Sequence, residues 1–344
     1  MKSRVYIAFI LVLAAATAWA QNDRKDKTAV TYEELYDEPY SVNKLFVGLQ
    51  PFYGEVFATN VNAGFGIEAS YYLKEKIDFR AHVRKTYSSG FFDFNRDLAL
   101  KNSNVSNKPE VFNYFELGVT YHFKDFEENG QTKMILYKNS YSGGKWAARV
   151  PLHAVVPAKV RKIYGGRFGA VVWNGTADLN RVMEDQGLTN ADLVTTEGIG
   201  LPLTYQDAGQ TKDFRVFGNI FANSLYLGGS MAWIRNVAVS FDKYEEGVDD
   251  GMLTVFLDIL YAPMLEIDPV KYQGNEHSTD AIKLSSLGGR VGIDGKFNRT
   301  LSWSYGGEVG YRPTVKGKGF YALLKVSFPV FGTNLDYKVE SFGK

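Results

Sequence analysis

The chain has 344 residues and a formal net charge of +1, and it contains no cysteine, 34 glycines and 15% aromatic residues. The absence of cysteine excludes disulfides, thiol catalysis and thiolate metal sites. The near-zero net charge gives no electrostatic reason to expect a nucleic acid as a partner. Aromatic residues and glycine in these amounts favour strands and tight turns over a helical domain.

Residues 1–20 have the three parts of a cleaved export signal. They are a basic start with Lys2 and Arg4, an apolar run over 7–16, and a small-x-small pattern at 18–20. A transmembrane anchor is the competing interpretation, but the apolar run is shorter than a membrane-spanning helix requires. We therefore expect the mature protein to be exported to the bacterial envelope.

The segment 21–43 follows the signal and is rich in charged residues. It has too few apolar residues to form a core, so the sequence predicts an extended, solvated arm on the periplasmic side. Tyr32, Leu35, Tyr36 and Tyr40 support the alternative, in which this arm docks onto a partner.

From 44 to 331 most of the chain alternates apolar and polar residues over segments of about ten residues, the length that a tilted strand needs to cross a bilayer. Leu301–Tyr311 shows the pattern well, with apolar or aromatic residues at most odd positions and polar or small residues at even positions. Thirteen segments are predicted as strands: 44–57, 61–73, 77–88, 111–124, 132–140, 147–156, 161–173, 213–226, 229–242, 251–263, 284–297, 300–313 and 318–331.

These segments predict an all-β fold, a closed antiparallel transmembrane β-barrel in the outer membrane. Because bacterial single-chain barrels have an even number of strands, we expect about 12 to 14. A soluble array of β-sandwiches stays open as the alternative, since its strands also alternate. The residues 332–344 are expected to form a C-terminal tail.

The lengths of the connections predict the orientation of the barrel. The very short connections 74–76 and 298–300 are typical of periplasmic turns, and three long polar segments are typical of external loops: 89–110, 174–212 and 264–283. One short amphipathic helix is predicted within 178–186, where Leu179, Val182 and Met183 have helical spacing.

The polar faces of the clear strands predict the lining of the lumen. An Arg or Lys that faces lipid near the middle of the bilayer costs about 2–4 kcal/mol, so these faces must point inward if the barrel forms. The predicted lumen residues are six acidic, six basic and two histidine side chains: Glu68, Asp78, Arg80, His82, Arg84, Glu116, His122, Asp258, Arg290, Asp294, Lys296, Glu308, Arg312 and Lys325. The sequence leaves open whether they line water or pair across a filled interior.

A search for catalytic motifs finds neither a G-x-S-x-G nucleophile elbow nor an H-E-x-x-H pair. His82, His122 and Glu116 form the one cluster that merits inspection, and hydrogen bonding within the lumen is the simpler role for it. We predict a protein that is not an enzyme and has no catalytic, metal or cofactor site.

Two segments, Glu116–Phe123 and Gly317–Phe328, resemble barrel strands of outer-membrane proteins from the Bacteroidota. The resemblance extends over most of the mature chain. It implies a barrel of the kind that serves in that phylum as a pore or as an accessory subunit of secretion and gliding machinery.

The function that we expect is a narrow, weakly selective pore for small solutes. The expected strand number lies between the eight strands that side chains fill and the sixteen that leave a channel, and the mixed lumen charge favours neither ion sign. Two alternatives stay open: a structural or accessory subunit of a larger secretion- or gliding-type assembly, and an outer-membrane lipid-modifying enzyme. The expected partners are outer-membrane lipid and, in the subunit alternative, other envelope proteins bound through 174–212 or 21–43.

Overall fold

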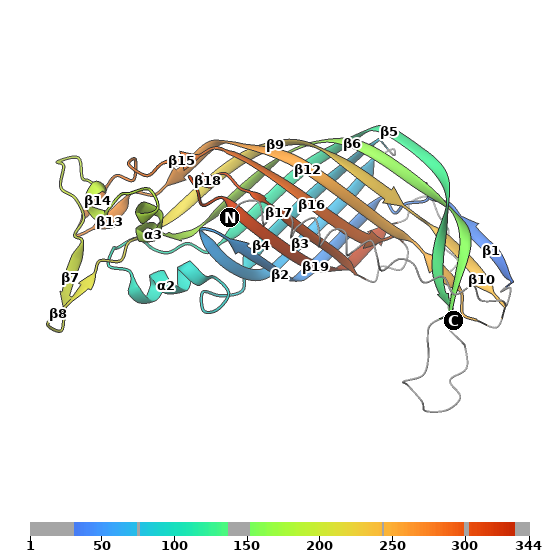
Figure 1. Cartoon of the computed structure of the whole chain (residues 1–344), viewed down its shortest axis with the longest axis horizontal. Coiled ribbons are helices and arrows are strands. Elements are labelled where there is room, and N and C mark those ends of the chain that lie inside the picture. The colour runs from blue at the N-terminus through green and yellow to red at the C-terminus, as the bar shows by residue number, and fades with distance from the viewer. Residues whose placement is uncertain (1–30, 74–75, 137–151, 243, 299–302, 334–344) are drawn as a thin grey trace, which may run out of the picture.

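The computed structural model describes residues 31–73, 76–136, 152–242, 244–298 and 303–333, which form a long cylinder of strands (Figure 1). Ten antiparallel strands make a closed barrel, in which each strand pairs with the next one along the chain and the last pairs with the first. They are β2 (Leu45–Phe57), β3 (Asn60–Leu73), β4 (Ile77–Thr86), β5 (Asn113–Leu136), β6 (Leu152–Asp178), β9 (Phe217–Ile234), β12 (Gly251–Ile267), β16 (Leu287–Phe297), β17 (Ser304–Tyr311) and β19 (Phe320–Thr333). The predicted closed antiparallel barrel is confirmed. Within these residues, no helix is long and apolar enough to cross a membrane.

The predicted number of 12 to 14 strands is wrong, because three barrel strands were each divided into two segments. β5 contains most of the segment 111–124 and the described part of 132–140. β6 contains 161–173 and the described part of 147–156, and β9 joins most of 213–226 to the start of 229–242. β5 pairs with β4 only as far as Tyr121, but with β6 as far as Leu136. Beyond the barrel wall neither face of a strand must be apolar, so the alternation fades there.

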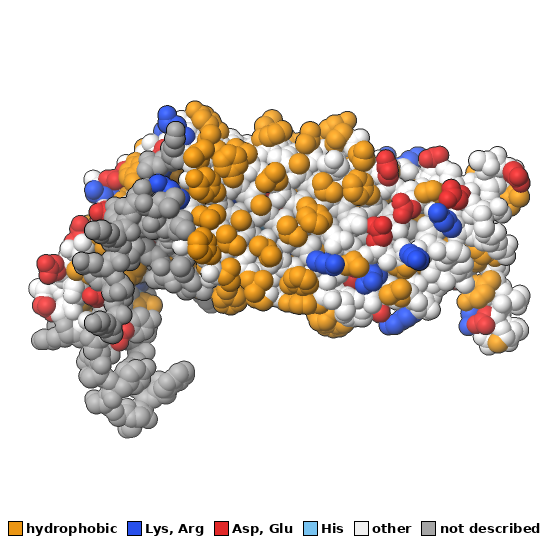
Figure 2. Space-filling model, turned by 180° about the vertical axis from the view of Figure 1, so that it is seen from behind, with side chains coloured by type: hydrophobic (Ala, Val, Ile, Leu, Met, Phe, Trp, Pro, Cys, Tyr) orange, Lys and Arg blue, Asp and Glu red, His pale blue; other side chains and the backbone are white. Residues whose placement is uncertain are grey.

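Alternation within the barrel separates two environments. Outward side chains such as Leu257, Ile259 and Leu324 are more than half exposed, whereas inward side chains such as Asp258 and Lys325 are buried. Figure 2 shows that apolar side chains cover the middle of one face of the barrel, and that charged side chains gather toward the ends. The outer surface is therefore an apolar belt.

The long connections gather at one end of the barrel (Figure 1). The predicted helix within 178–186 is confirmed as α3 (Leu179–Glu184), and the same connection holds η1 (Asn190–Asp192) and the hairpin of β7 (Thr204–Asp207) with β8 (Gln210–Asp213). The other elements at this end are the short strands β13 (Val270–Tyr272), β14 (Asn275–His277), β15 (Leu284–Ser285) and β18 (Thr314–Val315). Of the two predicted short turns, 74–75 and 299–300 lie outside the described residues.

A second loop helix, α2 (Phe94–Asn102), was not predicted. Its buried residues are Asn95 and Ala99, which give no apolar stripe that a sequence pattern could reveal.

The opposite end carries a small sheet outside the barrel. β1 (Tyr32–Asp37) pairs with β10 (Val237–Phe241), which pairs with β11 (Gly247–Asp249). This sheet packs against the part of β5 and β6 that extends past the barrel, and a small core lies between them: Met134, Leu136, Val156, Ala158, Val237, Val239 and Phe241.

Tyr32–Asp37 of the predicted arm is not a plain tail, because this segment is a strand of the small sheet, although most of its side chains are exposed. The Lys159 N–H donates to the Asp37 carboxylate over 2.8 Å, and the Arg161 guanidinium lies 4.4 Å from the centre of the Tyr40 ring. Burial, partly opposed by the hydrogen bond from Lys159, raises the pKa of Asp37. Residues 21–30 of the predicted arm lie outside the described residues.

We predict that Phe241→Ala releases β1 from the small sheet. The substitution removes the edge-on contact of Phe241 with Tyr32 and leaves a cavity, which costs about 3–5 kcal/mol when a phenylalanine is buried. Hydrogen exchange measured by mass spectrometry should become faster in 32–37 and stay unchanged in the barrel strands. Leu257→Ala, on the outer belt, is the control; unchanged exchange in 32–37 of Phe241→Ala would show that this core does not hold the arm.

Candidate functional site

The barrel interior is the candidate site, because side chains from strands that are not neighbours can meet only there. Arg290 of β16 is its centre. Its guanidinium donates to Glu116 of β5 over 2.5 Å and to Asp258 of β12 over 2.9 Å. It also donates to the hydroxyl of Tyr114 over 3.1 Å. Asp258 accepts two more bonds, of 2.8 and 3.1 Å, from Arg167 of β6, so one carboxylate lies between two guanidinium groups.

Two further ion pairs complete this level of the interior. Arg312, directly after β17, makes a two-bond contact with Glu55 of β2 over 2.8 and 3.1 Å, and Arg84 of β4 lies 3.3 Å from Glu308 of β17. Two tyrosine rings stack on these guanidinium groups. We name the following set the charged layer: Glu55, Arg84, Glu116, Arg167, Asp258, Arg290, Glu308 and Arg312. It has four acidic and four basic side chains, each of which has a partner of opposite sign.

The side chains of the charged layer are shielded from solvent in this structure. A side chain that lines a water-filled passage is exposed to water, but Asp258, Arg84, Arg290 and Arg312 are only 0–2% exposed. Each of the arginines Arg84, Arg290 and Arg312 also lies against an aromatic ring, with the guanidinium carbon 4.2–4.6 Å from the ring centre. The interior is therefore filled at this level.

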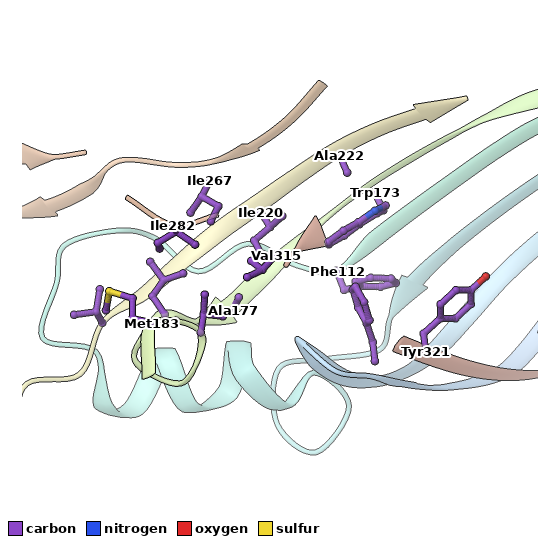
Figure 3. Close-up of a cluster of buried hydrophobic side chains, with 14 of the residues drawn as sticks. Phe112, Trp173, Ala177, Met183, Ile220, Ala222, Ile267, Ile282, Val315 and Tyr321 are labelled. Carbon is purple, nitrogen blue, oxygen red and sulfur yellow. The ribbon is translucent and has the colours of Figure 1, made fainter. Parts of the chain in front are cut away.

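Between the charged layer and the long connections lies an apolar cluster, which we name the apolar cap. Val182 and Met183 of α3 are buried in it, together with residues of β6, β9 and the loops. Figure 3 shows Met183 near Ile267, Ile282 and Val315, with Phe112, Trp173 and Tyr321 continuing toward the barrel. Its buried members include Phe57, Phe112, Trp173, Leu179, Met183, Leu193, Phe214, Ile220, Ile267, Ile282 and Val315. The connections thus close the barrel mouth.

On the other side of the charged layer lies a cavity of about 60 Å³, which has room for roughly four water molecules. Its wall is mostly apolar in area but contains several charged side chains, after which we name it the polar cavity. Lys325 lies at its wall, 3.0 Å from both Glu68 and Asp294, and Arg80 lies 3.5 Å from Asp294. A smaller cavity of about 10 Å³ adjoins Asp78. Charges of both signs line this end of the interior.

The structure places each of the fourteen predicted lumen residues either in the charged layer or at one of the two cavities below it. Eleven take part in ion pairs: Glu68, Asp78, Arg80, Arg84, Glu116, Asp258, Arg290, Asp294, Glu308, Arg312 and Lys325. His122 lies 2.9 Å from Asp78. Lys296 instead donates to Ser70 over 2.7 Å and lies 4.1 Å from the centre of the Phe46 ring. His82 borders the polar cavity. That these side chains line a passage for solutes stays a prediction.

The cluster singled out in the sequence is divided between two different sets of partners. His122 lies 2.9 Å from Asp78, whereas Glu116 binds Arg290 and Tyr114. His82 is the cross-strand neighbour of Glu116. The three residues therefore do not act as one cluster.

Sequence reasoning missed two members of the charged layer, Glu55 and Arg167. In β2 the pairing with β3 shifts between Gln50 and Tyr53, so even positions face inward before this bulge and odd positions after it. Pro51, which stands at the bulge, is the signal that could have revealed the shift. Arg167 shares the inward face of β6 with Val171 and Trp173, so that face is not polar enough to be recognised.

No protein-family model and no curated protein matches the chain. Solved structures that match include a TodX deltaS2S3 mutant monoaromatic hydrocarbon channel, with 11% identity over 84% of this chain and 90% of that chain, at a TM-score of 0.20. Another is the CymD monoaromatic hydrocarbon channel, with 8% identity over 87% of this chain and 93% of that chain, also at a TM-score of 0.20. At these TM-scores, what the two channels carry is no guide to this chain.

We predict that Asp258→Asn strongly destabilises the barrel, because it leaves two buried guanidinium groups without their shared carboxylate. Breaking a buried ion pair in this way costs about 3–5 kcal/mol. Urea unfolding in detergent micelles measures the change in the free energy of unfolding. Asp207→Asn breaks a half-exposed pair with Lys212 and should cost at most about 1 kcal/mol. Equal, small effects of the two substitutions would contradict a charged layer that is shielded from solvent.

Proposed function

We propose that this chain is a non-enzymatic β-barrel of the bacterial outer membrane that acts as a structural or accessory subunit of a larger envelope assembly. The membrane location is supported by the sidedness of the barrel. Apolar side chains such as Leu257 and Leu324 are exposed on its outer face, and eleven of the predicted lumen residues take part in ion pairs inside it. Export is supported by the signal pattern at 1–20.

The observation that carries the subunit role is the filled interior. A passive pore needs a hydrated passage, but here the charged layer and the apolar cap fill the barrel in succession. A barrel closed in this way acts through its surfaces. It carries an ordered sheet of β1, β10 and β11 on an extension of β5 and β6, which a simple pore does not need.

Other envelope proteins are the proposed partners, and two exposed surfaces support this proposal. In the loop 174–212, the apolar face of α3 is buried in the apolar cap. The hairpin of β7 and β8 is exposed, as are the side chains of Ile199 and Leu203, so these parts are open to a partner. On the other side of the barrel, Tyr32 and Leu35 are exposed on β1.

A narrow, weakly selective pore for small solutes is the second candidate, and the polar cavity favours it. That cavity already has acidic and basic side chains in its wall and room for water, so a rearrangement of the charged layer would extend it. The mixed charges would give little ion preference. The lipid-modifying enzyme is not favoured, because His122 and Glu116 are held by separate partners.

We predict that the mature protein fractionates with outer membranes and, unboiled, migrates anomalously on a detergent gel, because a closed barrel resists unfolding by detergent. Purification in mild detergent should also recover envelope proteins with it, and Phe241→Ala should lose those that bind through β1. Recovery as a soluble periplasmic monomer would reject the membrane barrel, and recovery of the barrel alone would count against the subunit role.

We predict that the wild-type protein gives no steady conductance in planar bilayers, whereas the double variant Glu116→Ala with Arg290→Ala conducts. The double variant keeps the net charge and leaves the Arg167–Asp258 and Arg84–Glu308 pairs intact, but it opens space at the centre of the charged layer. Conduction by the wild type would favour the pore instead. In that case Glu308→Lys should shift the ion preference toward anions, because it changes the wall charge by two units.

A further inference from the structure

An exposed group of aromatic rings lies at the rim of the barrel where the long connections begin. It consists of Phe65 on β3 and of Tyr87, Phe91 and Phe92 in the connection after β4. The ring centres of Phe65 and Tyr87, of Tyr87 and Phe92, and of Phe92 and Phe91 are 5.3, 5.3 and 5.2 Å apart. We name this group the rim aromatics. Phe91 is 91% exposed, which is unusual for a ring of that size in a soluble setting.

The backbone at Phe91 is strained. Its φ of 68° lies in the left-handed region, where a bulky residue is an outlier that persists only when the surrounding structure fixes it. A glycine would relieve the strain, and Gly90 stands directly before Phe91. The residue with the strained backbone is thus also the one whose large apolar ring is most exposed.

Asp93 fixes the chain next to Phe91. Its side chain is fully buried and accepts hydrogen bonds from Asn60 over 2.7 Å, from the Phe112 N–H over 3.1 Å and from Thr86 over 3.4 Å. The Phe92 carbonyl accepts from the Ala63 N–H over 2.9 Å. The Tyr87 hydroxyl donates to the carbonyl of Pro51, at the bulge in β2. The rim aromatics are thus held by the barrel wall rather than by a mobile loop.

The rim aromatics continue the apolar belt. Phe65 and Ile67 lie on the outward face of β3, and both are exposed. Lys85 is the cross-strand neighbour of Phe65 and is also exposed, so a cation lies at the edge of the belt beside the rings. Aromatic rings at the boundary of an apolar belt, next to a Lys that can extend toward the headgroups, match the chemistry of a lipid interface.

We propose that the rim aromatics and Lys85 bind an anionic, phosphate-bearing lipid of the outer leaflet, with the rings at the boundary of acyl chains and headgroups and the Lys85 ammonium at the phosphate. This proposal rests on the proposed membrane location of the barrel. Continuity with the belt supports lipid as the occupant, because a bilayer that surrounds the belt already reaches Phe65. The strained Phe91 then enters a medium in which its exposure is favourable.

Spin labelling tests the contact, and the cysteine-free chain allows a single label at each chosen site. Phe91→Cys is labelled in vesicles of phosphatidylethanolamine and phosphatidylglycerol, with Leu257→Cys in the belt and Gln210→Cys at the tip of the β7–β8 hairpin as references. The accessibility of each label to oxygen and to a water-soluble nickel chelate is measured. We expect the label at 91 to be more accessible to oxygen than to the chelate, as at 257 and opposite to 210.

A label at 91 that behaves like the label at 210, while the label at 257 reports lipid, would overturn the lipid contact and leave the membrane barrel in place. A label at 257 that reports water would instead reject the proposed membrane location. The two failures are therefore distinguishable.

The role of Lys85 is tested by thermal unfolding in vesicles with and without phosphatidylglycerol. We expect the anionic lipid to raise the midpoint of the wild type, and Lys85→Gln to lose this rise. Lys316→Gln, an exposed Lys in the connection between β17 and β19, makes the same charge change away from the rings and should keep it. An equal rise in Lys85→Gln and the wild type would overturn the phosphate contact.

Discussion

Closure of the barrel by β19 and β2 is the constraint on which the rest of the structure depends. An open sheet edge in a bilayer would leave backbone N–H and C=O groups without partners, each at a cost of several kcal/mol. The pairing of β19 with β2 removes that edge, although its register shifts twice. Once the ring is closed, each strand has one face toward the surroundings and one toward a confined interior. The contrasting chemistry of these faces follows from closure.

Confinement explains why the interior charges are balanced. A charge buried without a partner costs far more than a well-paired one, whereas a pair contributes little net stability compared with apolar residues of similar size. The four bases and four acids of the charged layer therefore do more to define which strands face each other than to add stability. Arg290 of β16 contacts Asp258 on the neighbouring strand β12 and Glu116 on β5, which lies across the lumen. It therefore fixes the cross-section of the barrel.

The sequence was sufficient for the parts of the fold that depend on local pattern. The two-residue period gave the barrel class and the inward placement of residues such as Asp258 and Arg290, and helical spacing gave α3. The sequence was insufficient where a strand no longer has one face toward the barrel interior and the other toward the surroundings, because the alternation of apolar and polar residues then has no physical cause. β5 and β6 leave the barrel wall, so their alternation fades and the strand count became too high. The bulge after Gln50 reverses the faces of β2, which hid Glu55.

The pairing of β1 with β10 could not be predicted, because it joins segments far apart in the chain and neither has a strong periodic pattern. Whether the interior is filled or open was also beyond sequence reasoning. It depends on how Arg84, Arg290 and Arg312 stack with rings from other strands, and residue types do not reveal those distances.

The position of β1 also imposes an order on assembly. Glu38, just after β1, is held by Asn236, which is 198 residues further along the chain. The first strand of the described chain therefore has no strand to pair with until β10 has been translocated. Closing so long a loop is entropically costly unless the intervening strands have already paired. β1 can then pair with β10 only after the hairpins between them have assembled. A barrel in which β1 is unpaired would therefore be incompletely assembled.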